Sequence, residues 1–324
     1  MSFLDDTEHF AALSERVQKI VRTMTWRHIH GMELLKFLFK FIALIVGFWI
    51  FSHDHFIWRM LGMLCMAYFF VSIAISGTHE ARHGTFAQSN IANRIWGYLF
   101  SDFWTGQSNE WWHDTHVLIH HPNTNIPTIN PPSFYFPWVN RYVYFFTLPY
   151  LILPWIVIGS IKHVWQHGLK LALYIFFLIS GLVAQFFLFL QVAPFWYAIL
   201  CVYLFRSLFA PLFMHLAVFN HVGLATPEKR LSWLNHQLKT TRNIKPHWFL
   251  SGMGGNAFVE CHTEHHIFPN LSNHILKRIR PVVKEYIQKL GYPYYEETYF
   301  TVLKEALKDY NQMFTLKPEK LPIA

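Results

Sequence analysis

Histidine side chains gathered in short stretches are the residues of this chain most suited to chemistry. The chain has 21 histidines, and the densest stretch, residues 111–121, reads WWHDTHVLIHH. On an α-helix, His113, His116 and His120 fall within about 60° of one another, with His121 roughly 80° to one side. This spacing predicts imidazoles that converge on one site.

Two further clusters have helical spacing. His79 and His83 lie four residues apart, and His262, His265 and His266 stand at positions i, i+3 and i+4. Residues at these separations share one face of a helix. A lone histidine is more often a core or surface residue than a ligand, but three such clusters favour a shared metal site.

The ligand type narrows the chemistry without fixing the metal. Neutral imidazoles suit iron, zinc and copper, whereas magnesium and calcium need oxygen ligands. A structural zinc site closes with four ligands, so eight or nine histidines are enough for two metals with open positions. Two such metals beside a bilayer indicate redox chemistry. Removing hydrogen from an unactivated methylene requires a stronger oxidant than any side chain, which predicts two irons, dioxygen and a lipid chain as substrate.

The composition indicates a membrane protein. The chain is 53% hydrophobic, 19% aromatic and 14% charged, which is too apolar for an ordinary soluble enzyme. Its formal charge of +8 comes without long basic runs, so no nucleic acid partner is expected. Cys65, Cys201 and Cys261 indicate neither a disulfide framework nor a cysteine-based zinc motif, because two lie in apolar runs and one adjoins the third histidine cluster.

Four apolar stretches are predicted to cross the bilayer as helices. They are Leu34–Phe51, Met60–Gly77, Leu171–Leu190 and Phe195–Met214. Tyr142–Ile161 is also apolar, but a crossing there would separate the third histidine cluster from the first two, so we expect this segment to be interfacial or re-entrant. Lysine and arginine concentrate outside the turns of the two hairpins, which predicts cytosolic clusters and cytosolic termini.

The predicted fold is therefore all-α: a polytopic membrane protein with four transmembrane helices in two hairpins and a cytosolic helical cap carrying the histidines. Ser2–Arg27 is predicted to be an exposed amphipathic helix, and it lacks the apolar core of a cleavable signal peptide. Pro122–Pro137 is predicted to be an irregular loop. Pro281–Leu290 and Tyr299–Phe314 are predicted to be cytosolic amphipathic helices.

The clusters resemble the three histidine boxes of the integral-membrane fatty acid desaturases. His79-x3-His83 is similar to the first box, and His116-x3-His120-His121, preceded by two tryptophans, is similar to the second. The stretch HTEHHIFP at 262–269 resembles the third box, and FNH at 219–221, QLKTTRN at 237–243 and WF at 248–249 resemble the approach to it. Residues 206–221 and the tail after the third box are most similar to one member whose substrate the resemblance does not identify.

This resemblance covers about Met60–Pro293, inside what we expect to be a single desaturase domain over residues 1–324. It implies two iron ions held by nine histidines, with dioxygen as co-substrate. The implied ligands are His79, His83, His116, His120, His121, His221, His262, His265 and His266. The second box has one residue more than the common H-x-x-H-H, which leaves His113 and His116 as alternatives for its first ligand; we favour His116.

Several other residues have two possible roles. His215 is a weaker candidate ligand than an interfacial core histidine. Arg206 interrupts the last predicted span and either snorkels to the surface or holds a substrate headgroup or a carboxylate. Four carboxylates could orient the imidazoles or could be simple exposed charges: Glu80, Asp114, Glu260 and Glu264.

The implied reaction is the O2-dependent insertion of a double bond into the acyl chain of a lipid or an acyl-CoA. The His-Pro-Gly-Gly signature of a fused cytochrome b5 domain does not occur, so electrons are expected from a separate donor of the cytochrome b5 or ferredoxin type. A basic surface could dock that donor or face lipid headgroups: Lys277, Arg278, Arg280 and Lys284.

The alternatives are a lipid hydroxylase or ketolase on the same scaffold and a non-catalytic metal-binding membrane protein. The expected location is an integral, multi-pass position in the endoplasmic reticulum of a eukaryote or the inner membrane of a bacterium.

Overall fold

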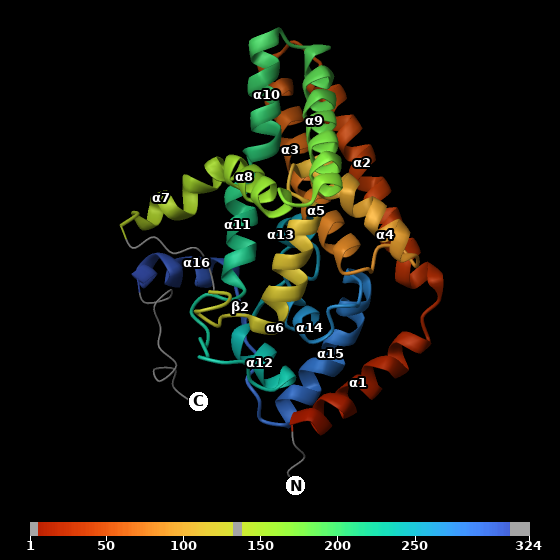
Figure 1. The fold of residues 1–324 in the computed structure, drawn as a ribbon, viewed down its shortest axis with the longest axis vertical. Coiled ribbons are helices and arrows are strands. Elements are labelled where there is room, and N and C mark those ends of the chain that lie inside the picture. Colours follow the sequence, from red (N-terminus) through yellow and green to blue (C-terminus); the bar gives the residue numbers. More distant parts are fainter. Residues whose placement is uncertain (1–5, 132–137, 312–324) are drawn as a thin grey trace. The chain divides into compact units, whose positions relative to one another are not determined.

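The computed structural model of the chain describes residues 6–131 and 138–311. Their regular secondary structure is almost entirely helical (Figure 1). Two short strands, β1 (Asn243–Ile244) and β2 (Glu296–Glu297), pair in parallel. The prediction of an all-α chain is confirmed.

The chain forms two compact units whose segments alternate along the sequence. Unit 1 comprises Met1–Met32, Thr115–Val143 and His215–Ala324, and unit 2 comprises Glu33–Asp114 and Tyr144–Met214. The second and third histidine clusters therefore belong mainly to unit 1, and the first belongs to unit 2. The expectation of a single domain remains a prediction.

Unit 2 contains the longest helices. Its elements are α2 (Met32–Phe51), α3 (Phe56–Arg82), α4 (Asn90–Gly97), the π-helix η2 (Tyr98–Thr105), α5 (Asn109–Trp112), the 3₁₀ helix η4 (Leu148–Leu151), α8 (Ile152–Val164), α9 (Gly168–Leu190) and α10 (Phe195–Ser207). Four elements contain residues of both units. One is α2, whose first residue, Met32, belongs to unit 1, and the others are η3 (His113–His120), α7 (Arg141–Phe146) and α11 (Ala210–Phe219).

Four helical stretches in the described residues are long and apolar enough to cross a membrane. They are Arg27–Phe51, Phe56–Arg82, Gly168–Leu190 and Phe195–Phe219. Each predicted span lies inside one of them, because the helices continue past the uncharged cores into polar residues such as His79. Their arrangement in two hairpins remains a prediction.

The segment Tyr142–Ile161 is broken into α7, η4 and α8, and it is not among these four stretches. Pro149 lies in η4 and Pro154 lies in the first turn of α8, where a missing N–H costs little. One side of α8 packs on α9, where Val157 and Ile161 adjoin the buried Tyr174. The structure therefore agrees that this segment is no full-length span, and its interfacial position remains a prediction.

Close backbone contacts hold unit 2 together. Gly181 of α9 lies against η2, and a Cβ atom at this position would be 1.8 Å from the carbonyl oxygen of Phe103. The indole of Trp104, also in η2, donates to the carbonyl of Phe70 in α3 at 3.0 Å. These contacts fix η2 between α3 and α9.

Unit 1 packs shorter helices around one hydrophobic core. Its elements are α1 (Asp6–Arg22), the π-helix η1 (Arg27–Gly31), α6 (His121–Asn123), α12 (Trp233–Thr240), α13 (Trp248–Gly254), α14 (His262–Ile267), α15 (Asn273–Lys289) and α16 (Tyr299–Lys308), with β1 and β2. The prediction that the N-terminal helix is exposed was wrong. Leu13 and Val17 are buried in the core, and α1 packs on α12 and α15 (Figure 1).

The predicted starts and ends of the last helices need correction. The helix predicted at Pro281 begins at Asn273 and includes that proline. The helix tolerates Pro281 because this residue faces solvent. Proline has no N–H to donate to the carbonyl four residues earlier, and water can bind that carbonyl instead. Helix α16 ends at Lys308, and residues 312–314 of the predicted helix lie outside the described residues.

Candidate metal centre

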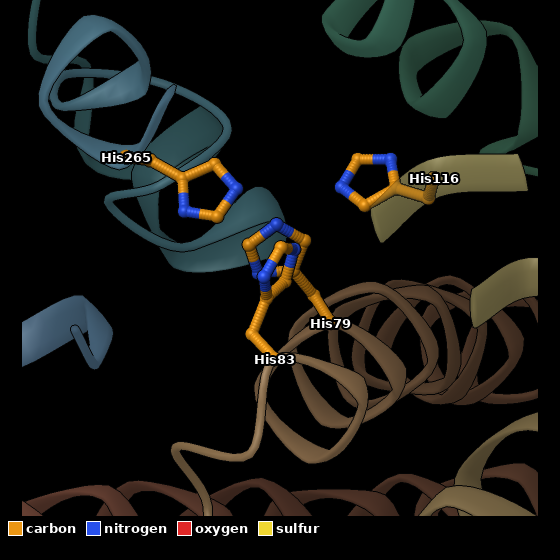
Figure 2. A group of neighbouring side chains, drawn as sticks. All are labelled: His79, His83, His116 and His265. Carbon is orange, nitrogen blue, oxygen red and sulfur yellow. The ribbon is translucent and has the colours of Figure 1, made fainter. Parts of the chain in front are cut away.

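The first histidine cluster lies at the end of α3 in unit 2. His79 and His83 are both buried, and their ring centroids are 4.5 Å apart. They project from the same side of the helix (Figure 2), as their four-residue spacing predicts. Ring-to-edge contacts with Trp112 at centroid distances of 5.8 and 6.1 Å restrict both imidazoles.

The second cluster is carried by a π-helix rather than the predicted α-helix. Element η3 runs through His116 to His120, and His121 begins α6. A π-helix has i→i+5 hydrogen bonds, so one turn takes somewhat more than four residues. His120 and His121 therefore both return to the side of His116, with ring centroids 5.2 and 4.9 Å away. The extra residue in the second box is absorbed by this wider turn.

Two imidazoles of unit 1 are oriented by backbone carbonyls. Nδ1 of His221 lies 2.9 Å from the carbonyl of Thr240, and Nδ1 of His262 lies 2.8 Å from the carbonyl of Ala257. A carbonyl can only accept a hydrogen bond, so each Nδ1 carries the proton and each Nε2 has a lone pair. Nevertheless, these two Nε2 atoms are 2.8 Å apart.

Two lone pairs at this distance repel unless a cation lies beside them. Two nitrogens bound at right angles to one metal, each at about 2.0–2.1 Å, are separated by about 2.9 Å. The His221 and His262 pair therefore fits a shared metal ion.

Two more imidazoles are oriented by amide side chains. Nδ1 of His120 lies 2.9 Å from Oδ1 of Asn130, and Nδ1 of His266 lies 3.0 Å from Oε1 of Gln237. Gln237 also donates from Nε2 to the carbonyl of His121 at 3.0 Å, which fixes its amide. Metal-bound histidines commonly have such partners on the second ring nitrogen.

The oriented nitrogens converge. One nitrogen each from His120, His221 and His266 lies within 4.8 Å of the others. The ring centroids of His120 are 4.7 Å from those of His221 and 5.0 Å from those of His266. In the described part of the chain, Nε2 of His266 is buried and has no hydrogen-bond partner. These donors can hold a first-row transition metal.

A neighbouring group in unit 1 contains His116, His121 and His265. The Nε2 atoms of His121 and His265 are 3.2 Å apart. The rings of His116 and His265 are nearly parallel, with centroids 6.3 Å apart (Figure 2). Unit 1 alone thus brings together seven predicted ligands: His116, His120, His121, His221, His262, His265 and His266.

Burial keeps these imidazoles neutral. It lowers the pKa of His120 to about 4 and that of His262 to about 3. Burial, reinforced by neighbouring histidines, also lowers the pKa of His221 and His266 well below the usual value. A neutral imidazole is the form that binds a metal, so the site is prepared for a cation near pH 7.

Three of the four carboxylates that could orient the imidazoles have other partners. Glu264 accepts from Asn243 at 3.0 Å and from Tyr294 at 2.6 Å. Glu260 accepts a hydrogen bond from Ser251 and pairs with Lys277. Asp114 lies in hydrogen-bond contact with His163. Among the described residues, none of these three carboxylates bonds a candidate ligand.

Glu80, the fourth carboxylate, accepts a hydrogen bond from the hydroxyl of Thr85 at 2.6 Å. The residues that do orient imidazoles, Asn130 and Gln237, were not predicted to do so. Gln237 belongs to the QLKTTRN motif, which was the available signal, whereas Asn130 lies in a loop rich in proline and asparagine.

The weaker candidate histidines occupy different environments. Nδ1 of His215 is 2.6 Å from the hydroxyl of Tyr299, and the ring stacks on Phe219 at a centroid distance of 4.9 Å. His113 interacts with the backbone of Arg82 in unit 2. The contacts of His116 with other histidines favour it over His113 as the first ligand of the second box, an assignment that remains a prediction.

The basic surface predicted after the third box is largely neutralised. Lys277 lies 2.9 Å from Glu260, Lys284 lies 2.6 Å from Glu296, and Arg280 also pairs with Glu296. Arg278 remains exposed. This pairing weakens the case for a strongly cationic docking surface.

A family comparison now decides where the chain belongs. The family model described as "Fatty acid desaturase" matches residues 55–298, which include all three histidine clusters. The chain belongs to the fatty acid desaturase family. The matched range agrees closely with the resemblance expected over residues 60–293.

Individual relatives point to one branch of the desaturases. Fatty acid desaturase 6 of Bos taurus is 29% identical to this chain, over 94% of the chain and 92% of the relative. The Homo sapiens protein of the same name is 28% identical, over 93% of this chain and 87% of the relative. Residues 206–221 and the tail after the third box had suggested this member.

More distant relatives are desaturases as well. The acyl-lipid (7-3)-desaturase of Diacronema lutheri is 25% identical, over 69% of this chain and 57% of its own length. No solved structure matches the chain significantly. Together with the four apolar helices, these similarities make the chain an integral membrane oxidoreductase of the desaturase family.

Proposed function

We propose that this desaturase is a di-iron, O2-dependent enzyme that inserts a double bond into a fatty acyl chain. Its proposed iron ligands are the histidines of the three boxes and one outside them: His79, His83, His116, His120, His121, His221, His262, His265 and His266. The observation that carries the proposal is the pair of Nε2 atoms of His221 and His262, 2.8 Å apart, each with its Nδ1 on a carbonyl.

Each part of the chain has a defined role in this proposal. The histidines hold the metals, Asn130 and Gln237 orient His120 and His266, and burial excludes water and protons from the ring nitrogens. Iron bound there would supply the power to activate dioxygen and oxidise an unactivated methylene. Two hydrogens leave adjacent carbons of the chain, and O2 with two electrons and two further protons becomes two waters.

The substrate and partners follow from the same chemistry. An acyl chain, esterified in a lipid or bound to CoA, would reach the site from the membrane. A separate one-electron carrier of the cytochrome b5 or ferredoxin type would deliver the electrons. We place the histidine boxes and both termini on the cytosolic side, in the endoplasmic reticulum of a eukaryote or the inner membrane of a bacterium.

The test combines metal content with product analysis. The full chain, purified in detergent, is analysed for metals by mass spectrometry, and fatty-acid profiles are recorded from cells that express it. His265→Ala removes a proposed ligand, and His53→Ala removes an exposed histidine as the matched control. We expect two irons per chain and a new unsaturated fatty acid with the native chain and the control, but not with His265→Ala.

Other outcomes would redirect the proposal. A hydroxylated product with two irons would indicate a hydroxylase, and a single zinc without product would indicate a non-catalytic metal-binding protein. Unchanged iron content in His265→Ala would exclude that histidine as a ligand.

A further inference from the structure

Unit 2 contains a cavity that the proposed metal chemistry does not use. The cavity has a volume of about 640 Å³ and lies between α8, α9 and α10. Its walls are aliphatic and aromatic, with Val157, Leu178, Leu182 and Val202 among them, and its one charged lining residue is Arg206. The volume lies in the range of pockets that hold small organic ligands.

The rim of this cavity is apolar and exposed. Leu151 is 54% exposed, Ile158 47% and Ile199 42%, and all three line the cavity. Helices α9 and α10 belong to stretches apolar enough to cross a membrane. Side chains of this kind on a membrane-spanning unit face acyl chains rather than water. A cavity with this lining and these exposed neighbours suits the acyl chain of a lipid.

Arg206 does not snorkel to the surface, because its side chain is only 7% exposed. Nη1 donates to Oε1 of Gln185 at 2.9 Å and to the carbonyl of Trp104 at 3.2 Å. Nη2 donates to the carbonyl of Thr105. The guanidinium is thus held rigidly beside the cavity by three acceptors.

All three acceptors are neutral. No carboxylate within residues 6–131 and 138–311 forms an ion pair with Arg206. A guanidinium has five N–H donors, and these bonds use three of them; its Cζ also lies 5.7 Å from the ring centroid of Phe70, which carries no charge. A buried cation without a counter-ion is costly, and an anionic group bound beside it would reduce that cost.

We propose that this cavity binds one long acyl chain ending in an anionic group, either a carboxylate or a phosphate. The chain lies along the apolar walls of α8, α9 and α10, and the anionic group lies at Arg206. The apolar walls exclude polar ligands, and the single fixed cation distinguishes an anionic amphiphile from a neutral one. None of the residues involved is a proposed iron ligand, so this site is independent of the di-iron proposal.

Photolabelling tests the site directly. The full chain in phosphatidylcholine nanodiscs is exposed to palmitic acid carrying a diazirine on its chain, and the labelled residues are mapped by mass spectrometry. Leu182→Trp fills the cavity from α9. Ile179→Trp is the matched control, because Ile179 lies on the same helix, is 55% exposed and does not line the cavity. Metal content is measured on every variant, which separates this test from that of the di-iron proposal.

We expect label at cavity residues such as Val157 and Val202. Leu182→Trp should reduce this label by about tenfold, since the apolar contact surface is lost, and Ile179→Trp should leave it unchanged. Label spread equally over Ile179 and the exposed Phe187 would overturn the proposal, because it would indicate ordinary lipid contact.

Competition tests the role of the cation. Unlabelled palmitate should displace the probe from the native chain at about tenfold lower concentration than palmityl alcohol, because only the carboxylate brings a negative charge to the guanidinium. Arg206→Gln should abolish this difference and Arg206→Lys should retain part of it. Equal competition by acid and alcohol in the native chain would refute the anionic site even if neither variant folds. Phosphatidic acid as a third competitor distinguishes a phosphate from a carboxylate.

Discussion

The two units both bury ionisable nitrogen, but they do so in opposite ways. Unit 1 buries neutral imidazoles whose lone pairs face one another, as His221 and His262 show, and a cation would stabilise the arrangement. Unit 2 buries a permanent cation, Arg206, among neutral carbonyls, and an anion would stabilise that arrangement. Buried polar groups whose partners are incomplete therefore indicate the sign of the ligand that each unit is built to hold.

The largest effect is expected from deleting one of the proposed histidine ligands of unit 1. His120→Ala should abolish the unsaturated product and lower bound iron, because the half-buried His120 lies among other histidines and its Nδ1 is oriented by Asn130. Metal analysis and fatty-acid profiles measure both effects. Iron content equal to that of the His53→Ala control would remove His120 from the ligand set.

Deleting a residue that orients a proposed ligand should have a smaller effect on metal binding. Gln237→Leu deletes the acceptor for Nδ1 of His266 and the donor to the carbonyl of His121, so metal affinity should fall by roughly 10–100-fold. Competition with a chelator measures the affinity. Gln288→Leu, an exposed glutamine on α15, is the matched control and should match the native chain. Equal affinities in the two variants would show that orientation of His266 is unimportant.

A buried carboxyl of unit 2 predicts a pH dependence of stability. Burial raises the pKa of Asp102 to about 8, although the backbone N–H of Asn109, at 2.8 Å, and nearby Arg82 both oppose the shift. Below the ordinary aspartate range, the group is protonated in both the folded and the unfolded chain. As the pH rises from that range to about 8, the unfolded chain releases the proton more readily, so stability falls and then levels off.

Asp102→Asn should flatten this slope. Thermal unfolding in detergent at several values between pH 5 and 9 measures it, and Asp54→Asn, at a fully exposed carboxylate of unit 2, serves as the control. A slope identical in the native chain and Asp102→Asn would show that Asp102 is ionised throughout.

The smallest expected effect separates a structural histidine from the ligands. Tyr299→Phe deletes the hydroxyl that bonds His215, which should lower the free energy of unfolding by about 1 kcal/mol. Iron content should not change, because His215 is outside the proposed ligand set. Loss of iron in this variant would return His215 to the list of ligands.

Hydropathy and histidine spacing predicted the parts of this molecule that depend on local sequence. The four apolar helices and the box histidines were found in this way, because span length and helical periodicity are properties of short stretches. Features that depend on tertiary contacts were missed. The segment Ser2–Arg27 was predicted to be exposed because its partners, α12 and α15, lie far away in the sequence, and they bury its Leu13 and Val17.

The orientation of the imidazoles could not be predicted for the same reason. Thr240 and Ala257 act through backbone carbonyls, and any residue type has one, so the sequence carries no signal for them. Asn130 lies ten residues from His120 in an irregular loop, and its contact exists only because the chain turns back there.

The π-helix at residues 113–120 has a consequence for comparing this chain with its relatives. A relative with two residues between the first histidine of the box and the following pair can place them on an ordinary α-helical turn, whereas this chain uses three residues and a wider turn. The correct alignment therefore has a one-residue gap in the middle of a helix, where gaps are normally penalised. With His116 as the first ligand, such an alignment keeps the direction of the histidines rather than the count of residues between them.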